Sequence, residues 1–395
     1  MKKILSSALA WAALAALSLV PAQAAGGGSP MVRSADFSLK LFRHEAAANS
    51  KNVLVSPFSA YDALCMTANG AAGSTLDQMA RVLGTGASKM ADLNDANNEV
   101  INRLNNSKQV QLEIANAIYA DTHTKFQPSF IKLCQQSYLA EAKNEDFADP
   151  QTVKKINGWC DTKTHGKIKE IIQKLTPDEK MVLLNSVYFK GAWQNAFNSG
   201  KTHDHQFSLI GGTSKQVPFM NKTFDIGYLA TTNLQAVRIP YKGYYQWMYI
   251  FLPDEKADFS AFKEQFTVEN WSAWMESFKE QKVNLSMPKY KVEFSTELSQ
   301  SLKAMGMAEA FEDKADFSKM FADRPSNISR VLQKTYMDVN EEGTEAAAVT
   351  AVVMQTKAIM LQDRSVNFVV DRPFVVALVD QPTGEILFMG SIVDP

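Results

Sequence analysis

Apolar and polar residues follow two different spacings along this chain, and the spacing changes near its middle. Before about residue 175, apolar side chains recur mainly every three or four positions, as over residues 37–48, which is typical of amphipathic helices. After it, short runs rich in β-branched and aromatic residues predominate, beginning with the nearly continuous apolar run at residues 181–189. Helices gathered early and strands gathered late, with pairing between distant segments, predict an α+β fold.

Individual elements follow from these spacings. We expect helices at residues 37–48, 61–70, 75–83, 94–104, 128–138 and 298–305, and a longer helical region at residues 150–175 that is broken at Gly166. Ser56 or Ser59 is placed to cap the helix at residues 61–70, after a short strand that begins at Asn52. We expect further strands at residues 110–119, 181–189, 205–209, 236–240, 244–252, 282–288, 290–294, 329–339, 367–370, 374–379 and 386–393.

Size, composition and charge indicate one large globular domain. Of the 395 residues, 46% are hydrophobic and 21% are charged, and neither an internal repeat nor a linker follows residue 30. With 41 basic and 42 acidic side chains the net charge is −1, which leaves no electrostatic footprint for nucleic acid. The lysines between residues 154 and 174 are interleaved with acidic residues, so we interpret them as a solvated helix face.

The N-terminal segment has the organisation of an export signal. Two lysines precede an apolar stretch at residues 4–20, and the sequence A-Q-A at residues 22–24 supplies a small-residue cleavage site. We therefore expect residues 1–24 to be a signal peptide and residues 25–34 a flexible leader, and the protein to be periplasmic or secreted. A retained membrane anchor is the alternative, but the apolar stretch is short for a stable membrane span.

Three cysteines, Cys65, Cys134 and Cys160, follow this segment. An odd number leaves at least one thiol free or paired between chains, although export permits disulfides. Cys65 lies within an apolar run, so we expect it to behave as a small buried hydrophobic residue.

The sequence lacks the motifs that would indicate an enzyme. It contains no G-x-S-x-G, H-E-x-x-H, Walker A or G-x-G-x-x-G pattern. His203 and His205 would share one face of a strand, which suits a metal ion, but no third ligand is evident nearby. We therefore expect these histidines to be exposed strand residues, and we expect no metal, no cofactor and no enzymatic activity.

The segment at residues 340–355, N-E-E-G-T-E-A-A-A-V-T-A-V-V-M-Q, combines helix-forming with strand-forming residues. Small or β-branched residues occupy every second position from Thr344 to Val352, and no proline interrupts the chain between Glu341 and Arg372. Such an apolar run would promote aggregation if it formed an exposed edge strand. We therefore expect it to be either buried or kept from pairing.

Eight motifs place this segment in a wider pattern. They lie at residues 52–59 (NVLVSPFS), 156–168 (INGW and THGKI), 184–193 (LNSVYFKGAW), 287–290 (MPKY), 315–318 (ADFS), 339–348 (VNEEGTEAAA), 371–374 (DRPF) and 388–395 (FMGSIVDP). On these motifs the chain resembles the serpins, a family of serine protease inhibitors, over residues 35–395. The resemblance implies a single serpin domain with three β-sheets, eight or nine helices, and an exposed reactive-centre loop near residues 341–366.

In that family a serine or cysteine protease cleaves the loop and forms an acyl-enzyme, and the freed segment then inserts into the large sheet and distorts the protease. The resemblance assigns the start of the loop, here called the hinge, to Glu341, Glu342, Gly343, Thr344, Glu345, Ala346, Ala347 and Ala348. On insertion, alternate side chains would enter the buried face of the sheet, namely Thr344, Ala346, Ala348, Thr350, Val352 and Met354. None of these is charged, and Gly343 adds backbone freedom. We therefore expect a monomeric suicide-type inhibitor, and the alternative is a non-inhibitory carrier or structural protein.

Two counts along the loop give different cleavage sites. Counting forward from the start of the hinge gives Lys357–Ala358, and counting back from the end of the loop gives Gln362–Asp363, which implies an insertion. We favour Lys357, because only residues before the cut become the inserted strand. A cut at the later site would add about 16 Å of slack between sheet and protease.

The residues before the cut indicate which proteases the loop would attract. Lys357 predicts trypsin-like enzymes. Val353 and Met354 offer secondary sites for elastase- or chymotrypsin-like enzymes. Papain-like cysteine proteases are an alternative class of target.

A polar cluster beneath the large sheet is the second feature that the resemblance implies. In the family this cluster, the shutter, holds the central strands together before insertion, and Ser56, Ser59 and Asn185 match it. Gln333 stands where a histidine is usual, and glutamine can donate and accept hydrogen bonds but does not titrate. We therefore expect a barrier to sheet opening that is independent of histidine protonation. Trp193 matches a position beneath the start of the loop, and an ordinary core tryptophan is the alternative there.

Overall fold

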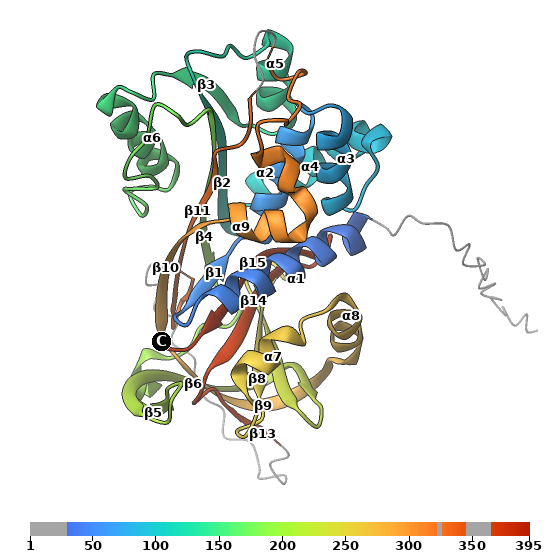
Figure 1. Ribbon diagram of the computed structural model, residues 1–395. Coiled ribbons are helices and arrows are strands. Elements are labelled where there is room, and N and C mark those ends of the chain that lie inside the picture. Colours follow the sequence, from blue (N-terminus) through green and yellow to red (C-terminus); the bar gives the residue numbers. More distant parts are fainter. Residues whose placement is uncertain (1–29, 322–325, 345–364) are drawn as a thin grey trace, which may run out of the picture.

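The computed structural model describes residues 30–321, 326–344 and 365–395, which form an elongated molecule (Figure 1). Its helices are α1 (Pro30–Ala48), α2 (Pro57–Ala68), α3 (Gly73–Val82), α4 (Met90–Asn105), α5 (Pro128–Ser137), α6 (Pro150–Lys163), α7 (Phe259–Glu264), α8 (Val268–Ser277) and α9 (Ser299–Leu302). Its strands are β1 (Val53–Val55), β2 (Val110–Asp121), β3 (Glu141–Glu145), β4 (Met181–Ala192), β5 (His203–Ser208), β6 (Ser214–Ala230), β7 (Leu234–Pro240), β8 (Gln246–Pro253), β9 (Lys279–Pro288), β10 (Tyr290–Glu297), β11 (Arg330–Asn340), β12 (Gly343–Thr344), β13 (Val366–Val369), β14 (Phe374–Asp380) and β15 (Glu385–Ile392).

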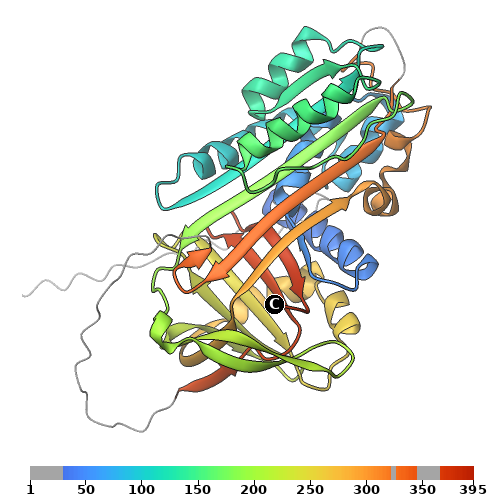
Figure 2. The ribbon, with the colours of Figure 1, turned by 90° about the vertical axis from the view of Figure 1, so that its left-hand side faces the viewer.

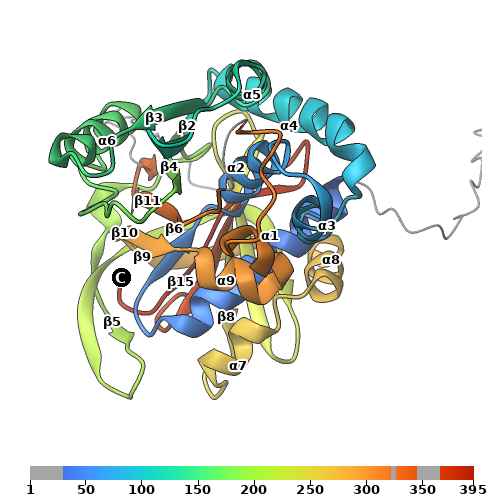
Figure 3. The same cartoon turned by 45° about the horizontal axis from the view of Figure 1, so that its top comes forward.

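The first sheet has six strands in the order β10-β11-β12-β4-β2-β3. Its long strands β4, β11 and β10 run side by side along the molecule (Figure 2). β4 is buried along almost its whole length, because α6 covers one face of the sheet and α2 lies against the other (Figure 3). A strand buried on both faces shows no polar alternation, which explains the continuous apolar run that predicts it.

The second sheet has the order β1-β15-β14-β8-β7-β6-β9-β13, and β5 pairs with β6. β6 pairs with β5 at its start, with β9 over most of its length and with β7 at its end. The two smaller sheets that the resemblance implies are thus joined through β6. The α+β class and the eight or nine helices that the resemblance implies are confirmed, with nine α-helices in the described ranges.

Three hydrophobic clusters hold these layers together. The first fills the second sheet and its contacts with α1, α7 and α8. The second lies between the first sheet and the group of α2, α3, α4, α5 and α9. The third lies between α6 and the opposite face of the first sheet. Any strand added to the middle of the first sheet would therefore have both of its faces buried.

The helical region predicted over residues 150–175 is wrong beyond the end of α6. His165 and Gly166 both have positive φ angles, 51° and 79°, through which a helix does not continue. The side chain of Asn157 then satisfies the irregular backbone that follows. Its amide nitrogen donates to the carbonyl of Ile172 (2.8 Å), and its oxygen accepts from the N–H of the same residue (3.1 Å).

The start of α2 also differs from the prediction, because the helix begins at Pro57 rather than at Tyr61. Ser56 occupies the N-cap position, but its hydroxyl donates to the carbonyl of Leu387 (2.6 Å) instead of capping the helix. Ser59 lies inside the helix, so the predicted N-cap position is confirmed for Ser56 only, and without the expected side-chain hydrogen bond. Pro57 favours the helix start instead, since its fixed φ suits the first turn.

Three further predictions concern the cysteines, the paired histidines and the N-terminal segment. All three cysteines are free and buried, and burial raises the pKa of Cys160 to about 11 and that of Cys134 to about 12. His203 and His205 are exposed on β5, and they belong to no group of three metal-binding side chains in the described part of the chain. The predicted signal peptide lies outside the described residues. No described helix is long and apolar enough to span a membrane.

Candidate functional site

β11 and β4 are direct neighbours at one end of the first sheet and separate at the other. Over Arg330–Tyr336 and Val182–Tyr188 they form a parallel ladder. Beyond this ladder β12 lies between them, and Thr344 pairs antiparallel with both Val339 and Gly191. The chain therefore turns back after β11 and starts a new strand in the gap.

Gly343 allows β12 to approach β4 this closely. Its φ angle of 152° lies in a region that residues with a side chain rarely adopt. A Cβ atom at this position would lie 2.0 Å from the carbonyl oxygen of Gly191 and 2.7 Å from the Cα atom of Ala192. Position 343 therefore requires glycine for its backbone conformation and for space.

Trp193 anchors the turn between β11 and β12. Its backbone N–H donates to the carbonyl of Glu342 (2.8 Å), and its indole N–H donates to the carbonyl of Asn340 (2.9 Å). The N–H of Phe197 donates to the carbonyl of Glu341 (2.7 Å). Trp193 is buried like an ordinary core residue, but it also binds the hinge through both of its N–H groups.

The carboxylate of Glu341 holds the same turn through its side chain. It accepts a hydrogen bond from the Thr202 hydroxyl (2.7 Å) and forms an ion pair with Lys289 (2.9 Å). Burial alone would raise the pKa of Glu341, but Lys289 and Thr202 outweigh burial and hold the pKa below its ordinary value. Oε2 of Glu342, by contrast, is buried without a hydrogen-bond partner among the described residues. Among the described contacts, the turn is therefore held by the side chain of Glu341 but only by the backbone of Glu342.

Thr344, the last described residue of the hinge, is fully buried. Its hydroxyl oxygen lies 2.6 Å from the phenol oxygen of Tyr241. The ring of Tyr241 stacks on Trp193, with 4.5 Å between the ring centroids. Sequence reasoning missed Tyr241, because this residue lies in the short connection between two predicted strands.

The four polar residues predicted for the shutter meet where β4 and β11 are still paired. Asn185 and Gln333 lie opposite each other in the parallel ladder, and Gln333 Nε2 donates to Asn185 Oδ1 (2.6 Å). Gln333 also donates to the carbonyl of Ser56 and accepts from its N–H, each at 2.9 Å. Asn185 Nδ2 donates to the hydroxyl of Ser59. Neutral amides thus link the two strands to the start of α2.

The shutter network continues to two residues that sequence reasoning missed. Asn185 donates to Oδ1 of Asn116 on β2 (2.5 Å), and Asn116 donates to Oδ2 of Asp62 on α2 (2.8 Å). Asp62 is fully buried, and its other carboxylate oxygen has no hydrogen-bond partner within the described ranges. Burial raises the pKa of Asp62 well above its ordinary value, and the bond from Asn116 offsets this only in part. The shutter therefore contains a titratable group that is a carboxyl rather than an imidazole.

The remaining predicted loop residues lie outside the described residues. They are the second half of the hinge (Glu345, Ala346, Ala347 and Ala348), the two candidate cleavage sites (Lys357–Ala358 and Gln362–Asp363) and the secondary sites (Val353 and Met354). Their functions stay predictions.

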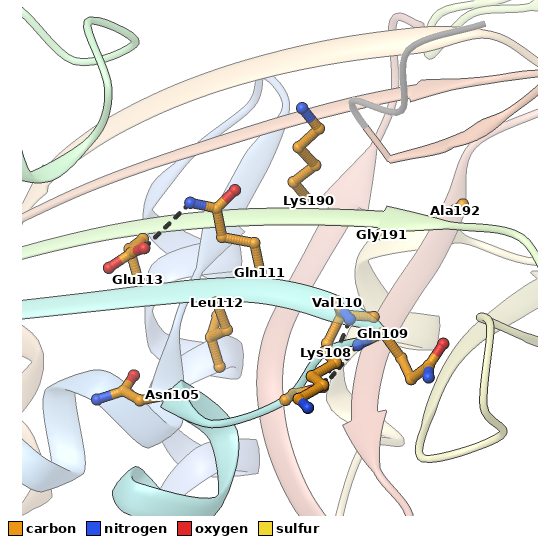
Figure 4. A pocket seen from close by; sticks show the side chains of 11 residues that line it. Asn105, Lys108, Gln109, Val110, Gln111, Leu112, Glu113, Lys190, Gly191 and Ala192 are labelled. Atoms are coloured by element: carbon orange, nitrogen blue, oxygen red, sulfur yellow. Dashed lines mark hydrogen bonds between the residues drawn. The ribbon is translucent and has the colours of Figure 1, made fainter. Parts of the chain in front are cut away.

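A cavity of about 600 Å³ lies beside the hinge, between the end of α4 and the paired ends of β2 and β4 (Figure 4). Gly191 and Ala192, which pair with β12, form part of its wall. Gln111 and Lys190 also line it, and Gln111 donates to Glu113 (3.1 Å). About half of the lining consists of amide and charged side chains, and these described residues bring no nucleophile together with a general base.

Known proteins share this arrangement along nearly the whole chain. A family model described as "Serpin (serine protease inhibitor)" matches residues 32–395. Serpin B6 of Macaca fascicularis is 35% identical over 370 residues, which cover 91% of this chain and 97% of the relative. The leukocyte elastase inhibitor of Bos taurus is 33% identical over 372 residues, with the same two coverages.

Solved structures agree with the sequence relatives. Tengpin, a thermophilic serpin in its native state, gives a TM-score of 0.85 at 32% identity, over 92% of this chain and 94% of tengpin. Human thyroxine-binding globulin gives a TM-score of 0.85 at 28% identity, over 93% of this chain and 98% of the globulin. The chain therefore belongs to the serpin family, many of whose members are serine protease inhibitors.

Proposed function

We propose that this protein is an exported, suicide-type inhibitor of serine endopeptidases that traps its target by inserting the cleaved loop between β4 and β11. The observation that carries the proposal is β12. Its two residues already form a strand in the gap, with Gly343 in van der Waals contact with β4 and Thr344 fully buried. A loop that only connects two elements runs over the protein surface, so its first residues have no reason to be buried and paired within a sheet.

Extension of β12 would exchange one ladder for two. β4 and β11 share a parallel ladder, whereas a strand that grows from β12 would separate them and pair antiparallel with each. Antiparallel pairing is slightly more stable per residue, and the sheet would gain backbone hydrogen bonds. Because both faces of the sheet are covered, the apolar side chains of the new strand would also leave water. Pairing and burial together supply the driving force.

Cleavage would free the loop for this extension. The serine Oγ of the protease attacks the carbonyl carbon of Lys357, the bond to the nitrogen of Ala358 breaks, and the serine proton ends on the new amino group of Ala358. An ester then joins Lys357 to the protease. Insertion of the loop competes with hydrolysis of this ester, and completed insertion would carry the protease to the far end of the sheet.

The register of β12 supports Lys357 over Gln362 as the cleavage residue. Because Thr344 lies opposite Gly191, a strand that continued in this register would reach the first residue of β4 at Met354. A cut after Lys357 would leave a short link to the protease. A cut after Gln362 would lengthen that link by about 16 Å of extended chain, so the protease would be distorted less.

The same register would bring Thr350 between Asn185 and Gln333. The hydrogen bond of 2.6 Å between these two amides would have to break before the strand could pass. We therefore assign the main resistance to insertion to the shutter. Because amides do not titrate, this resistance should not follow histidine protonation.

Lys357 favours trypsin-like proteases as targets. A relative, the leukocyte elastase inhibitor of Bos taurus, is named as an inhibitor of an elastase. An elastase-like enzyme is therefore a reasonable second target, and Val353 and Met354 are the residues after which it would cleave. Papain-like cysteine proteases are an alternative class, since they also form an acyl-enzyme. Thyroxine-binding globulin shares the fold, so the fold alone does not separate an inhibitor from a carrier, and the buried start of β12 favours the inhibitor.

The test is incubation of the mature protein with trypsin at several molar ratios, followed by denaturing electrophoresis and mass spectrometry. We expect an SDS-resistant covalent complex and release of a C-terminal peptide that begins at Ala358. A peptide that begins at Asp363 would move the cleavage site. Turnover of the protein at every ratio, with no complex, would contradict the inhibitor and favour a carrier.

Two further measurements test the remaining parts of the proposal. Protein cleaved in the loop should unfold at a clearly higher temperature than intact protein, because insertion adds a central strand. An unchanged unfolding temperature would contradict insertion. Export is tested by sequencing the N-terminus of the protein recovered outside the cytoplasm, which we expect to begin near Ala25.

A further inference from the structure

The phenol of Tyr241 is buried, and its hydroxyl is committed to the hinge. Tyr241 follows β7 directly and has no exposed surface. Its hydroxyl oxygen lies 2.6 Å from Thr344 Oγ1, and it makes no other hydrogen bond within the described ranges. A buried hydroxyl without a partner is unfavourable, so this contact matters to both residues.

The tyrosine ring has little freedom to move. It stacks on Trp193 at 4.5 Å with an interplanar angle of 23°, and it meets Phe189 edge-on at 5.1 Å. A Cβ atom at Gly191 would lie 2.9 Å from the ring of Tyr241. The missing side chain at position 191 therefore lets the ring approach β4 directly opposite Thr344. The hydroxyl is held at one place beneath the gap.

A fixed hydroxyl at this place selects one register for β12. With Thr344 opposite Gly191 and Val339, its hydroxyl reaches Tyr241. A slip of one residue would present either Gly343, which has no hydroxyl, or Glu345, whose charge would be buried against the phenol. Backbone hydrogen bonds alone do not distinguish these registers, whereas the close fit of Gly343 against β4 and the hydroxyl pair of Thr344 both do.

We propose that Tyr241 is a positioning residue that fixes the register in which the loop begins to insert, by pairing its hydroxyl with that of Thr344. This inference rests on the proposed inhibitory function. Insertion competes with hydrolysis of the acyl-enzyme, so time that the hinge spends out of register increases the share of inhibitor that is cleaved without trapping protease. Position 344 therefore requires a hydroxyl side chain, and not only a small one.

The experiment compares Y241F, T344V and the double variant in their stoichiometry of inhibition with trypsin, which is the number of inhibitor molecules consumed per complex. T344V keeps the shape of threonine and removes only the hydroxyl. We expect each single variant to raise the stoichiometry severalfold, and the double variant to raise it no further than the larger single effect. T344S keeps the hydroxyl and should lie closer to the unmodified protein than T344V does.

Tyr290 supplies a matched control. It is also buried, but its hydroxyl has no hydrogen-bond partner in the described structure, so Y290F removes an equivalent atom without breaking a contact. We expect Y290F to leave the stoichiometry unchanged. Equal effects of Y241F and Y290F, additive effects in the double variant, or equal behaviour of T344S and T344V would each overturn the inference.

A second readout does not depend on a protease. Amide hydrogen exchange at Gly343 and Thr344 should be faster in Y241F and T344V than in the unmodified protein, and unchanged in Y290F. If the unmodified protein forms no complex with trypsin, the proposed function fails, while the exchange rates still decide whether Tyr241 fixes the register. Unchanged exchange in Y241F would reject the positioning assignment alone.

Discussion

The two ends of the β4–β11 pair are held together in opposite ways. At the hinge end the strands are already apart, and β12 is fixed there by backbone hydrogen bonds, the glycine at position 343 and one hydroxyl pair. At the shutter end the strands are direct neighbours, and buried amide side chains connect them to each other and to α2. The same sheet is therefore open at one end and closed at the other.

This difference separates two properties of an inserting strand. In the proposed function, the hinge would determine where insertion starts and in which register, because its contacts are those of a strand already in place. The shutter would determine how much free energy opening requires, because its amides would have to give up buried hydrogen bonds before a strand could pass. Changes at the hinge should therefore alter the outcome with a protease, whereas changes at the shutter should alter the stability of the uncleaved protein.

The largest effect is expected at the hinge, from Thr344→Arg. The guanidinium group would have to be buried at a position with no exposed surface, which costs several kcal/mol. β12 would then leave the gap, and since 1.4 kcal/mol is a factor of ten, the trapped fraction of trypsin should fall at least about a hundredfold. Denaturing electrophoresis measures the complex. Thr122→Arg, on an exposed turn, is the matched control, and undiminished trapping by T344R would contradict insertion.

A smaller effect of a different kind is expected at the shutter, from Gln333→Leu. The leucine would leave the N–H of Ser56 and the side-chain oxygen of Asn185 without partners, while the carbonyl of Ser56 would keep only its bond from the N–H of Ala60. We expect the free energy of unfolding to fall by about 3 kcal/mol, measured in urea. Gln135→Leu, on an exposed position of α5, should change it by less than about 0.5 kcal/mol. Equal effects at the two positions would show that the shutter amides do not hold the sheet closed.

The same two regions show how far the sequence alone specifies a site. Asn185 and Gln333 could be predicted, because a polar residue inside an apolar strand must meet a partner and the family resemblance supplies one. Asp62 could not, because pattern arguments put a charged helical residue on the solvent face, and every residue of α2 is buried. Tyr241 lies in a connection, where no periodicity indicates which way a side chain points.

The same distinction applies to whole strands and helices, which could be predicted only where their side chains follow a regular pattern. β4 was predicted because burial on both faces leaves a continuous apolar run. β6 was missed, because exposed and buried residues follow no regular alternation along it and Pro218 and Gly227 interrupt the pattern. α7 and α8 were missed because each is too short to establish a helical period.

A third prediction concerns pH and separates the shutter from an unrelated buried carboxyl. The pKa of Asp62 is raised in the fold, so its contribution to stability is full below the unfolded value and is lost as pH rises toward the raised folded value. Asp62→Asn removes this loss, because asparagine can still accept from Asn116. We expect equal stability near pH 4 and a more stable variant at pH 8, measured by urea unfolding at each pH.

Glu385→Gln is the matched comparison. Burial raises the pKa of Glu385 from 4.5 to about 7. The free energy of unfolding of the unmodified protein should therefore fall as pH rises from about 4.5 to about 7. At pH 8 the E385Q variant should be more stable than the unmodified protein by up to about 3 kcal/mol. Glu385 lies at the start of β15, outside the shutter network. E385Q should therefore change stability without changing the rate at which the heated, uncleaved protein inserts its loop, whereas D62N should change both. Identical behaviour of the two variants would remove Asp62 from the shutter.

The smallest effect is expected from the ion pair between Glu341 and Lys289. Lys289 is 36% exposed and Glu341 is 13% exposed, so water and salt screen the pair, and a double-mutant cycle with E341Q and K289M should give a coupling energy of at most about 1 kcal/mol. Because the pKa of Glu341 is lowered in the fold, this stabilisation is present above its ordinary pKa and is lost as pH falls through the folded value.

Amide hydrogen exchange at Gly343, measured at low and high salt, distinguishes this weak ion pair from the uncharged contacts of the hinge. High salt should speed exchange slightly in the unmodified protein and leave it unchanged in K289M, since the glycine fit, the backbone bonds from Trp193 and the hydroxyl pair of Thr344 are uncharged. A coupling energy above about 2 kcal/mol would mean that charge holds the hinge as firmly as amides hold the shutter. In that case the open end of the sheet would also resist insertion. This result would contradict the assignment of register to the hinge and of resistance to the shutter.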